Sequence, residues 1–228
     1  MNVKLVSYSR NANHPELQDE LINTKSLTDL IAYCARVSNP GNQNNPKTAE
    51  KLIKYLIKHK HWSPLEMVSV CMEITTTRDI ARQILRHRSF SFQEFSQRYA
   101  DPVDELSFVQ REARMQDTVN RQNSLPCDDM DLKVAWLMKQ SMIIHEAKLA
   151  YKWAIENGIA KEQARAVLPE GNTISRMYMN GSLRSWVHYI ELRSGNGTQK
   201  EHRDIAIDCA YQLSTVFPII TDLIPRGE

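Results

Sequence analysis

The densest group of potentially reactive side chains lies in RHRSFSFQEFSQR, residues 86–98. Three consecutive bases, Arg86, His87 and Arg88, precede alternating serines and phenylalanines, an acid and a further arginine. The guanidinium group has a planar fork of donors that suits bidentate binding of phosphate, and serine hydroxyls add short hydrogen bonds. The segment therefore indicates a site for a phosphate-bearing ligand.

Two other interpretations of this segment compete with a phosphate site. Cations at a helix C-terminus are stabilised by the macrodipole by roughly 0.3–1 kcal/mol without any ligand, so an isolated RHR triplet more often marks a helix end. The arginines and phenylalanines of the same segment would also suit a single-stranded nucleic acid, with phosphate contacts and base stacking. A net charge of only +2 and an aromatic content of 7% argue against that class.

Two arginines elsewhere raise the same question of an anionic partner. Arg203 is expected near the N-terminus of a helix, where a cation is disfavoured unless Glu201, Asp204 or a ligand compensates it. Arg176 falls in a strand-like segment, and a half-buried guanidinium there would require a partner.

Several other site types have little support in the sequence. The four cysteines are scattered and form no CxxC pair, which argues against a disulfide framework or a zinc site and favours a reducing cytoplasm. The histidines lack metal-ligand spacing, and neither a Walker A motif nor GxGxxG is present. No apolar run approaches the ~18 residues of a membrane helix, and the N-terminus lacks the apolar region of a signal peptide.

The elements that must position these residues follow from hydrophobic periodicity. Alternation of apolar and polar residues within 66–78 predicts a half-buried strand, and 2–8 and 173–182 are further strand candidates. Helical spacing predicts helices over 26–37, 47–60, 78–88, 131–158, 161–169, 182–193 and from 198 onward. Ser26 with Asp29, and Thr198 with Glu201, have the spacing of capping boxes.

This mixture predicts an α+β fold in which helices pack on a small, mostly antiparallel sheet. A length of 228 residues without a linker or repeat fits a single domain, residues 1–228.

Four ordered blocks of the sequence resemble the flavin-dependent thymidylate synthases. RHR, seven residues and then Ser96 match the signature of that family, and FSQRYA continues it. The other blocks are KHKHWSPLEMVSV, LPEGNTISRMYMNGSLRSWVHYIELR and LRSGNGTQKEHRDIA, so the resemblance spans roughly residues 50–217.

The resemblance implies reductive methylation of dUMP to dTMP. Methylenetetrahydrofolate would supply the carbon, and FAD reduced by NADPH would supply the hydride. It also implies a homotetramer with shared active sites and no cysteine nucleophile. Cys127 fits the last point, because the two aspartates that follow it disfavour a thiolate.

The resemblance also assigns residues. FAD would contact Ser63, Arg86, His87, Arg88, Glu94, Arg193 and Asn196. The substrate dUMP would contact Gln83, Arg86, Glu94, Ser96, Gln97, Arg98, Arg176 and Arg203. Arg203 would act catalytically by stabilising the uracil ring as N3 loses its proton. Misplacement of Arg203 or Ser96 would instead favour a flavin- or nucleotide-binding module without catalysis.

The sequence departs from the family pattern at three places. Glu191 stands where some members have an amide, which puts its flavin contact in doubt. The SGNG turn is a residue longer than in some relatives, so Gly197 or Thr198 could replace Asn196. Met67 stands where other members place histidine.

Overall fold

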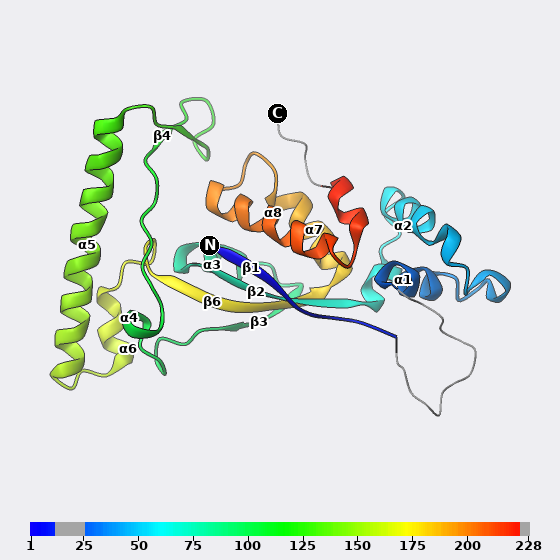
Figure 1. Cartoon of the computed structure of the whole chain (residues 1–228), viewed down its shortest axis with the longest axis horizontal. Helices are drawn as coiled ribbons and strands as arrows, with labels where there is room; N and C mark the ends of the chain where they lie inside the picture. The colour runs from blue at the N-terminus through cyan, green and yellow to red at the C-terminus, as the bar shows by residue number, and fades with distance from the viewer. Residues whose placement is uncertain (12–25, 224–228) are drawn as a thin grey trace.

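A four-stranded antiparallel sheet forms the centre of the structure, a computed structural model that describes residues 1–11 and 26–223 (Figure 1). Its order is β1-β2-β6-β3, and every neighbouring pair is antiparallel. The strands are β1 (Asn2–Tyr8), β2 (Ser69–Thr77), β3 (Phe90–Glu94) and β6 (Ile174–Ser182). The α+β prediction with a small antiparallel sheet is therefore confirmed.

The helices are arranged around this sheet and at its two ends. α7 and α8 lie together over one face, α5 stands at one end, and α1 and α2 lie at the other (Figure 1). The helices are α1 (Leu27–Ala35), α2 (Ala49–Lys58), α3 (Arg78–Ile84), α4 (Pro102–Glu105), α5 (Met130–Glu156), α6 (Lys161–Ala164), α7 (Leu183–Arg193) and α8 (Lys200–Ser214). A separate two-stranded hairpin pairs β4 (Arg114–Gln116) with β5 (Ser124–Pro126).

The main core lies between the sheet and the helices α7 and α8. Inward residues of β2 and β6, such as Met72 and Met179, are fully buried, as the period of two predicts. Trp186 of α7 joins them, and its indole N–H donates to the Val70 carbonyl at 2.9 Å. This bond links the first turn of α7 to β2.

Local signals give some helix boundaries correctly and others incorrectly. The Ser26–Asp29 capping box at the start of α1 is confirmed. The capping box predicted for Thr198 is wrong, because its hydroxyl donates to the Leu192 carbonyl and α8 begins only at Lys200. The Thr198 hydroxyl therefore bonds to the end of α7 and does not cap the N-terminus of α8.

Two predicted helices are also shorter than their periodicity suggested. α3 ends at Ile84, so the RHR triplet lies in the turn before β3 and not in the last helical turn. The helix predicted over 161–169 divides into α6 and a 3-10 segment, Arg165–Val167. Within the described ranges, no helix is long and apolar enough to cross a membrane.

Candidate active site

The turn between α3 and β3 holds His87 against α7. Its Nε2 accepts a hydrogen bond from Arg193 Nε at 2.9 Å, and its ring meets Tyr189 edge-on with 4.9 Å between centroids. Burial, followed by the charges of Arg193 and Arg86, lowers the pKa of His87 to about 4. His87 is therefore neutral at pH 7, which is the state that an acceptor nitrogen requires.

The C-terminal part of α3 is bonded to the beginning of α8 through Gln83. Gln83 Nε2 donates to Gln199 Oε1 at 2.8 Å, and Gln83 Oε1 lies 3.2 Å from His202 Nδ1. Burial, followed by the charges of Arg193 and His87, lowers the pKa of His202 to about 3. Two neutral imidazoles thus lie among the cations of this region.

Arg203 lies next to this network and has no partner in it. Its side chain is partly exposed and forms no hydrogen bond or ion pair within the described part of the chain. The local pairings that would have explained it are not formed. Asp204 binds Lys200 at 2.8 Å, while Glu201 accepts from Gln199 Nε2 at 2.9 Å.

Further cations and polar residues near the same helices face solvent. The side chains of Arg86 and Arg88 are exposed and, over residues 1–11 and 26–223, form no hydrogen bond or ion pair. Ser63 is exposed at the start of the 3-10 segment Ser63–Met67, which contacts α7. Asn196 is exposed in the turn after α7. We refer to Gln83, Arg86, His87, Arg88, Arg193 and Arg203 as the α3–α8 cluster.

A second group gathers where β3 ends beside β6. Glu94 accepts from Ser175 Oγ at 2.6 Å and lies 3.6 Å from an Arg78 guanidinium nitrogen. The Phe95 N–H donates to the Arg176 carbonyl at 2.8 Å. The Arg176 side chain is exposed and not half-buried as predicted, because its neighbours Ser175 and Met177 take the inward positions.

The segment after β3 completes this second group. Gln97 is buried, and its Nε2 has no hydrogen-bond partner among the described residues. Ser96 is exposed, and Arg98 is exposed with an ion pair to Glu162 at 3.3 Å. We refer to Glu94, Ser96, Gln97, Arg98 and Arg176 as the β3–β6 cluster.

The two clusters lie toward opposite ends of α3. Glu94 is paired with the first residue of α3, whereas Gln83 and the RHR turn lie at the other end of that helix. β3 itself carries the chain about 13 Å from Phe90 to Glu94. Residues predicted to bind one nucleotide are thus distributed over two places.

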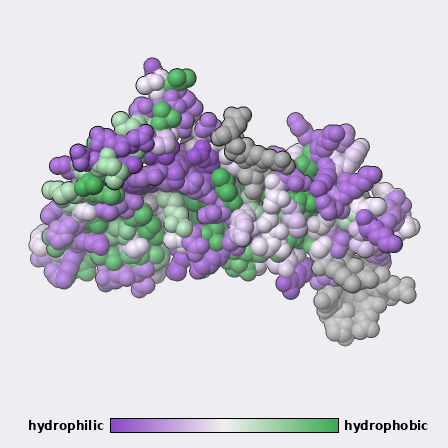
Figure 2. Space-filling model, turned by 45° about the horizontal axis from the view of Figure 1, so that its top comes forward, coloured by the Kyte–Doolittle hydropathy of each residue, from purple (hydrophilic) through white to green (hydrophobic). Residues whose placement is uncertain are grey.

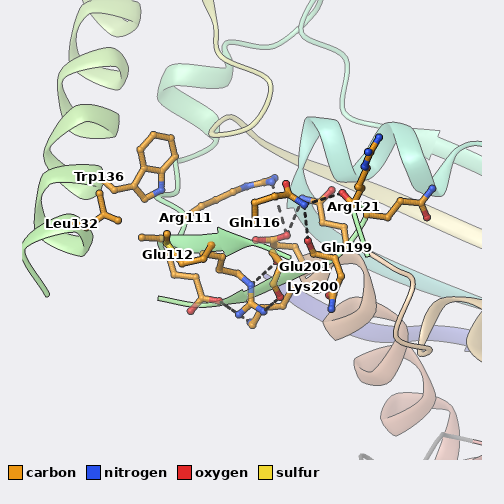
Figure 3. Close-up of a pocket in the computed structure, with 15 residues that line it drawn as sticks. Arg111, Glu112, Gln116, Arg121, Leu132, Trp136, Gln199, Lys200 and Glu201 are labelled. Atoms are coloured by element: carbon orange, nitrogen blue, oxygen red, sulfur yellow. Dashed lines mark hydrogen bonds and ion pairs between the residues drawn. The ribbon is translucent and has the colours of Figure 1, made fainter. Parts of the chain in front are cut away.

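A cavity of about 570 Å³ lies beside the beginning of α8, whose Gln199 is hydrogen-bonded to Gln83 (Figure 3). Figure 3 shows Trp136 and Leu132 of α5 on one side and Gln199 and Glu201 on the other. Arg111, which lines the cavity, connects α3 with α8. It forms an ion pair with Asp79 of α3 at 2.6 Å and lies 4.0 Å from Glu201 of α8. The sequence did not predict the residues that line this cavity, nor the hydrogen bonds that join Gln83 to Gln199 and His202. These residues are far apart in the chain, so no short motif includes them.

A known protein family matches a range of this chain that includes both clusters. The family described as thymidylate synthase complementing protein matches residues 20–219. The probable flavin-dependent thymidylate synthase of Paramecium bursaria Chlorella virus 1 is 47% identical over 220 residues, which cover 96% of this chain and 97% of the relative. The chain belongs to the flavin-dependent thymidylate synthase family. The enzyme of Synechocystis sp. is 46% identical, with 96% of this chain and 97% of the relative covered.

A solved structure supports the fold of this member of the flavin-dependent thymidylate synthase family. The UMP/dUMP methylase PolB from Streptomyces cacaoi, bound with 5-Br dUMP, superposes with a TM-score of 0.77. The two chains are 24% identical, and the match covers 97% of this chain and 93% of PolB. The family suggested by the four sequence blocks is confirmed.

Proposed function

We propose that this protein is a flavin-dependent thymidylate synthase that methylates dUMP to dTMP. The observation that carries the proposal is the set of unpaired arginines in the α3–α8 cluster. Arg86, Arg88 and Arg203 have no ion-pair partner in the described part of the chain, and the two imidazoles near them are neutral. Anionic ligands would supply the missing charge, which both a flavin dinucleotide and dUMP carry.

The flavin is proposed to be FAD, held by the RHR turn and its neighbours. Exposed guanidinium groups at Arg86 and Arg88 suit its phosphates, and the Arg193–His87 pair forms an ordered polar wall beside them. Ser63, Glu94 and Asn196 are the remaining proposed contacts. When bound, FAD reduced by NADPH supplies the hydride, while methylenetetrahydrofolate supplies the carbon.

The nucleotide is proposed to lie between Arg203 and the β3–β6 cluster. Arg203 has an unpaired guanidinium group, which would stabilise negative charge on the uracil ring as N3 loses its proton. Gln83 and Arg86 would bind from the same side. The other proposed contacts are Glu94, Ser96, Gln97, Arg98 and Arg176. The Nε2 of Gln97 is buried and has no partner among the described residues.

The cysteines support a mechanism without a thiolate nucleophile. Burial raises the pKa of the Cys34, Cys71 and Cys209 thiols. Cys127 is buried, and its thiol lies 3.7 Å from the Asp129 carbonyl. All four cysteines are free, as suits the cytoplasmic location that we propose.

The active site is proposed to be shared between copies in a homotetramer. The placement of the two clusters at opposite ends of α3 is compatible with this, because a neighbouring copy would bring its own β3–β6 cluster to the α3–α8 cluster. An exposed apolar surface on α5 offers an interface, and hydrophobic patches lie among polar ones at that end of the molecule (Figure 2). Its residues include Leu132, Val134, Trp136, Met138, Met142, Ile143, Leu149 and Trp153, each at least 42% exposed.

The proposal is tested with the purified full chain. We expect bound flavin absorbance, and dTMP formation that requires dUMP, methylenetetrahydrofolate and NADPH together. Light scattering should give the mass of four 26.4 kDa chains. A colourless protein that forms no dTMP after FAD is added would overturn the proposal, and so would tight binding to single-stranded DNA without turnover.

A further inference from the structure

His202 is a fully buried polar residue with one polar contact. It is 0% exposed, and its Nδ1 lies 3.2 Å from Gln83 Oε1. Its Nε2 has no hydrogen-bond partner among residues 1–11 and 26–223. Because the ring is closed off from solvent, it cannot touch a nucleotide directly, and any influence on the site passes through Gln83.

The direction of the hydrogen bonds in this network is set by Glu201. A carboxylate only accepts, so the group of Gln199 that contacts Glu201 Oε2 at 2.9 Å must be its amide nitrogen. Gln199 Oε1 is then an acceptor, and Gln83 must donate to it with Nε2 at 2.8 Å. Gln83 Oε1 consequently faces His202, whose Nδ1 must carry the proton.

The surroundings of His202 keep the imidazole in this state. Its ring centroid is 5.8 Å from that of Tyr189 and 6.3 Å from that of His87. The ring is fully buried among these neighbours, and as a neutral imidazole it has one N–H to donate. The amide of Gln83 is thus held on both sides, by an acceptor on Gln199 and a donor on His202.

We propose that His202 is a positioning residue that locks the side-chain amide of Gln83 in one orientation for nucleotide binding. This inference rests on the proposed function, in which Gln83 contacts dUMP. With one N–H and one lone pair already used, Gln83 presents its remaining N–H and lone pair to the ligand in a fixed order. Without His202, the amide can rotate, and part of the population would present the wrong group.

The test compares two substitutions of similar shape in the FAD-loaded full chain. His202→Asn keeps an N–H near the position of Nδ1, whereas His202→Leu removes it. We expect His202→Leu to raise the KM and the Kd for dUMP about tenfold, the usual effect of losing one buried hydrogen bond. The value of kcat at saturating dUMP should stay within about twofold, and His202→Asn should restore most of the affinity.

Two further variants separate positioning from packing. Tyr189→Phe removes a buried hydroxyl that has no partner among the described residues, so it should leave dUMP affinity unchanged. In a Gln83→Ala background, His202→Leu should have no additional effect on dUMP affinity, because the residue acts through Gln83. Additive losses in that double variant would overturn the inference.

The outcomes also distinguish this inference from the proposed function. If the wild-type protein binds dUMP and forms dTMP, but the Leu and Asn variants have equal affinities, the positioning role is refuted and the function stands. If wild-type protein binds no dUMP by calorimetry, both fail. Loss of bound flavin in His202→Leu but not His202→Asn would show that the ring supports the RHR turn, which would also refute the role through Gln83.

Discussion

Replacement of Arg203 by alanine should separate activity from stability. The side chain lies in the first turns of α8, which begins at Lys200, and forms no bond within the described chain. A cation near a helix N-terminus is disfavoured by roughly 0.3–1 kcal/mol, so its removal should leave the free energy of unfolding unchanged or raise it by up to that amount.

The expected loss of activity is much larger. A fixed donor aimed at developing negative charge contributes roughly 10²–10³ in kcat when it is removed by mutation. We therefore expect Arg203→Ala to retain its flavin spectrum and its melting temperature while kcat for dTMP formation falls by roughly 10²–10³. Turnover is measured under saturating substrates, and unfolding is followed in urea.

Lys200→Ala is the matched control. It removes a cation from the same helical turn, but one that is already paired with Asp204 at 2.8 Å and Glu112 at 3.6 Å. Its turnover should remain within severalfold of wild type. Near-normal turnover in Arg203→Ala would refute the catalytic assignment, and a stability loss above about 1 kcal/mol would refute the conclusion that this arginine is unpaired.

Three other perturbations test the fold and the cofactor site. Gly181→Ala should destabilise the protein by about 1–3 kcal/mol in urea unfolding, because a Cβ there would lie 2.5 Å from Phe90 Cδ1; wild-type stability would contradict this packing. Arg86→Ala should weaken flavin binding about 10–100-fold by equilibrium dialysis, through loss of a charge-assisted bond, and unaltered occupancy would count against its phosphate contact. The pKa values of His87 and His202 lie near 4 and 3, below the unfolded value of 6.5, so the unfolded chain binds more protons as pH falls from 6.5 to 4. Stability should therefore fall over that interval and stay level from pH 7 to 8, and His202→Asn should show a shallower fall; parallel curves would refute the contribution of His202.

The sequence was most informative where its signal was local. Alternation in β2 predicted the strand and its buried face, and the Ser26 cap fixed the start of α1. The signal failed where long-range bonds replaced local ones. Thr198 bonds to the end of α7 and so cannot cap α8, and the helical pattern through the RHR triplet gave no sign that α3 ends at Ile84.

The candidate site shows the same contrast between local sequence signals and long-range contacts. The types and order of its charged residues, including the RHR triplet and the downstream arginines, were sufficient to suggest the family. They did not give the partners of those residues. His87 and Arg193 are 106 positions apart in the chain, and Gln83 and His202 are 119 apart.

The sequence by itself determined the α+β class, the family and the charged side chains that suit two anionic ligands. Only the tertiary structure decided that the Arg203 side chain is left unpaired, that His202 is buried against Gln83, and that the β3–β6 and α3–α8 clusters lie toward opposite ends of α3. The reason is that hydrophobic periodicity and capping act over a few residues, whereas these contacts depend on how the β1-β2-β6-β3 sheet places α3 beside α8.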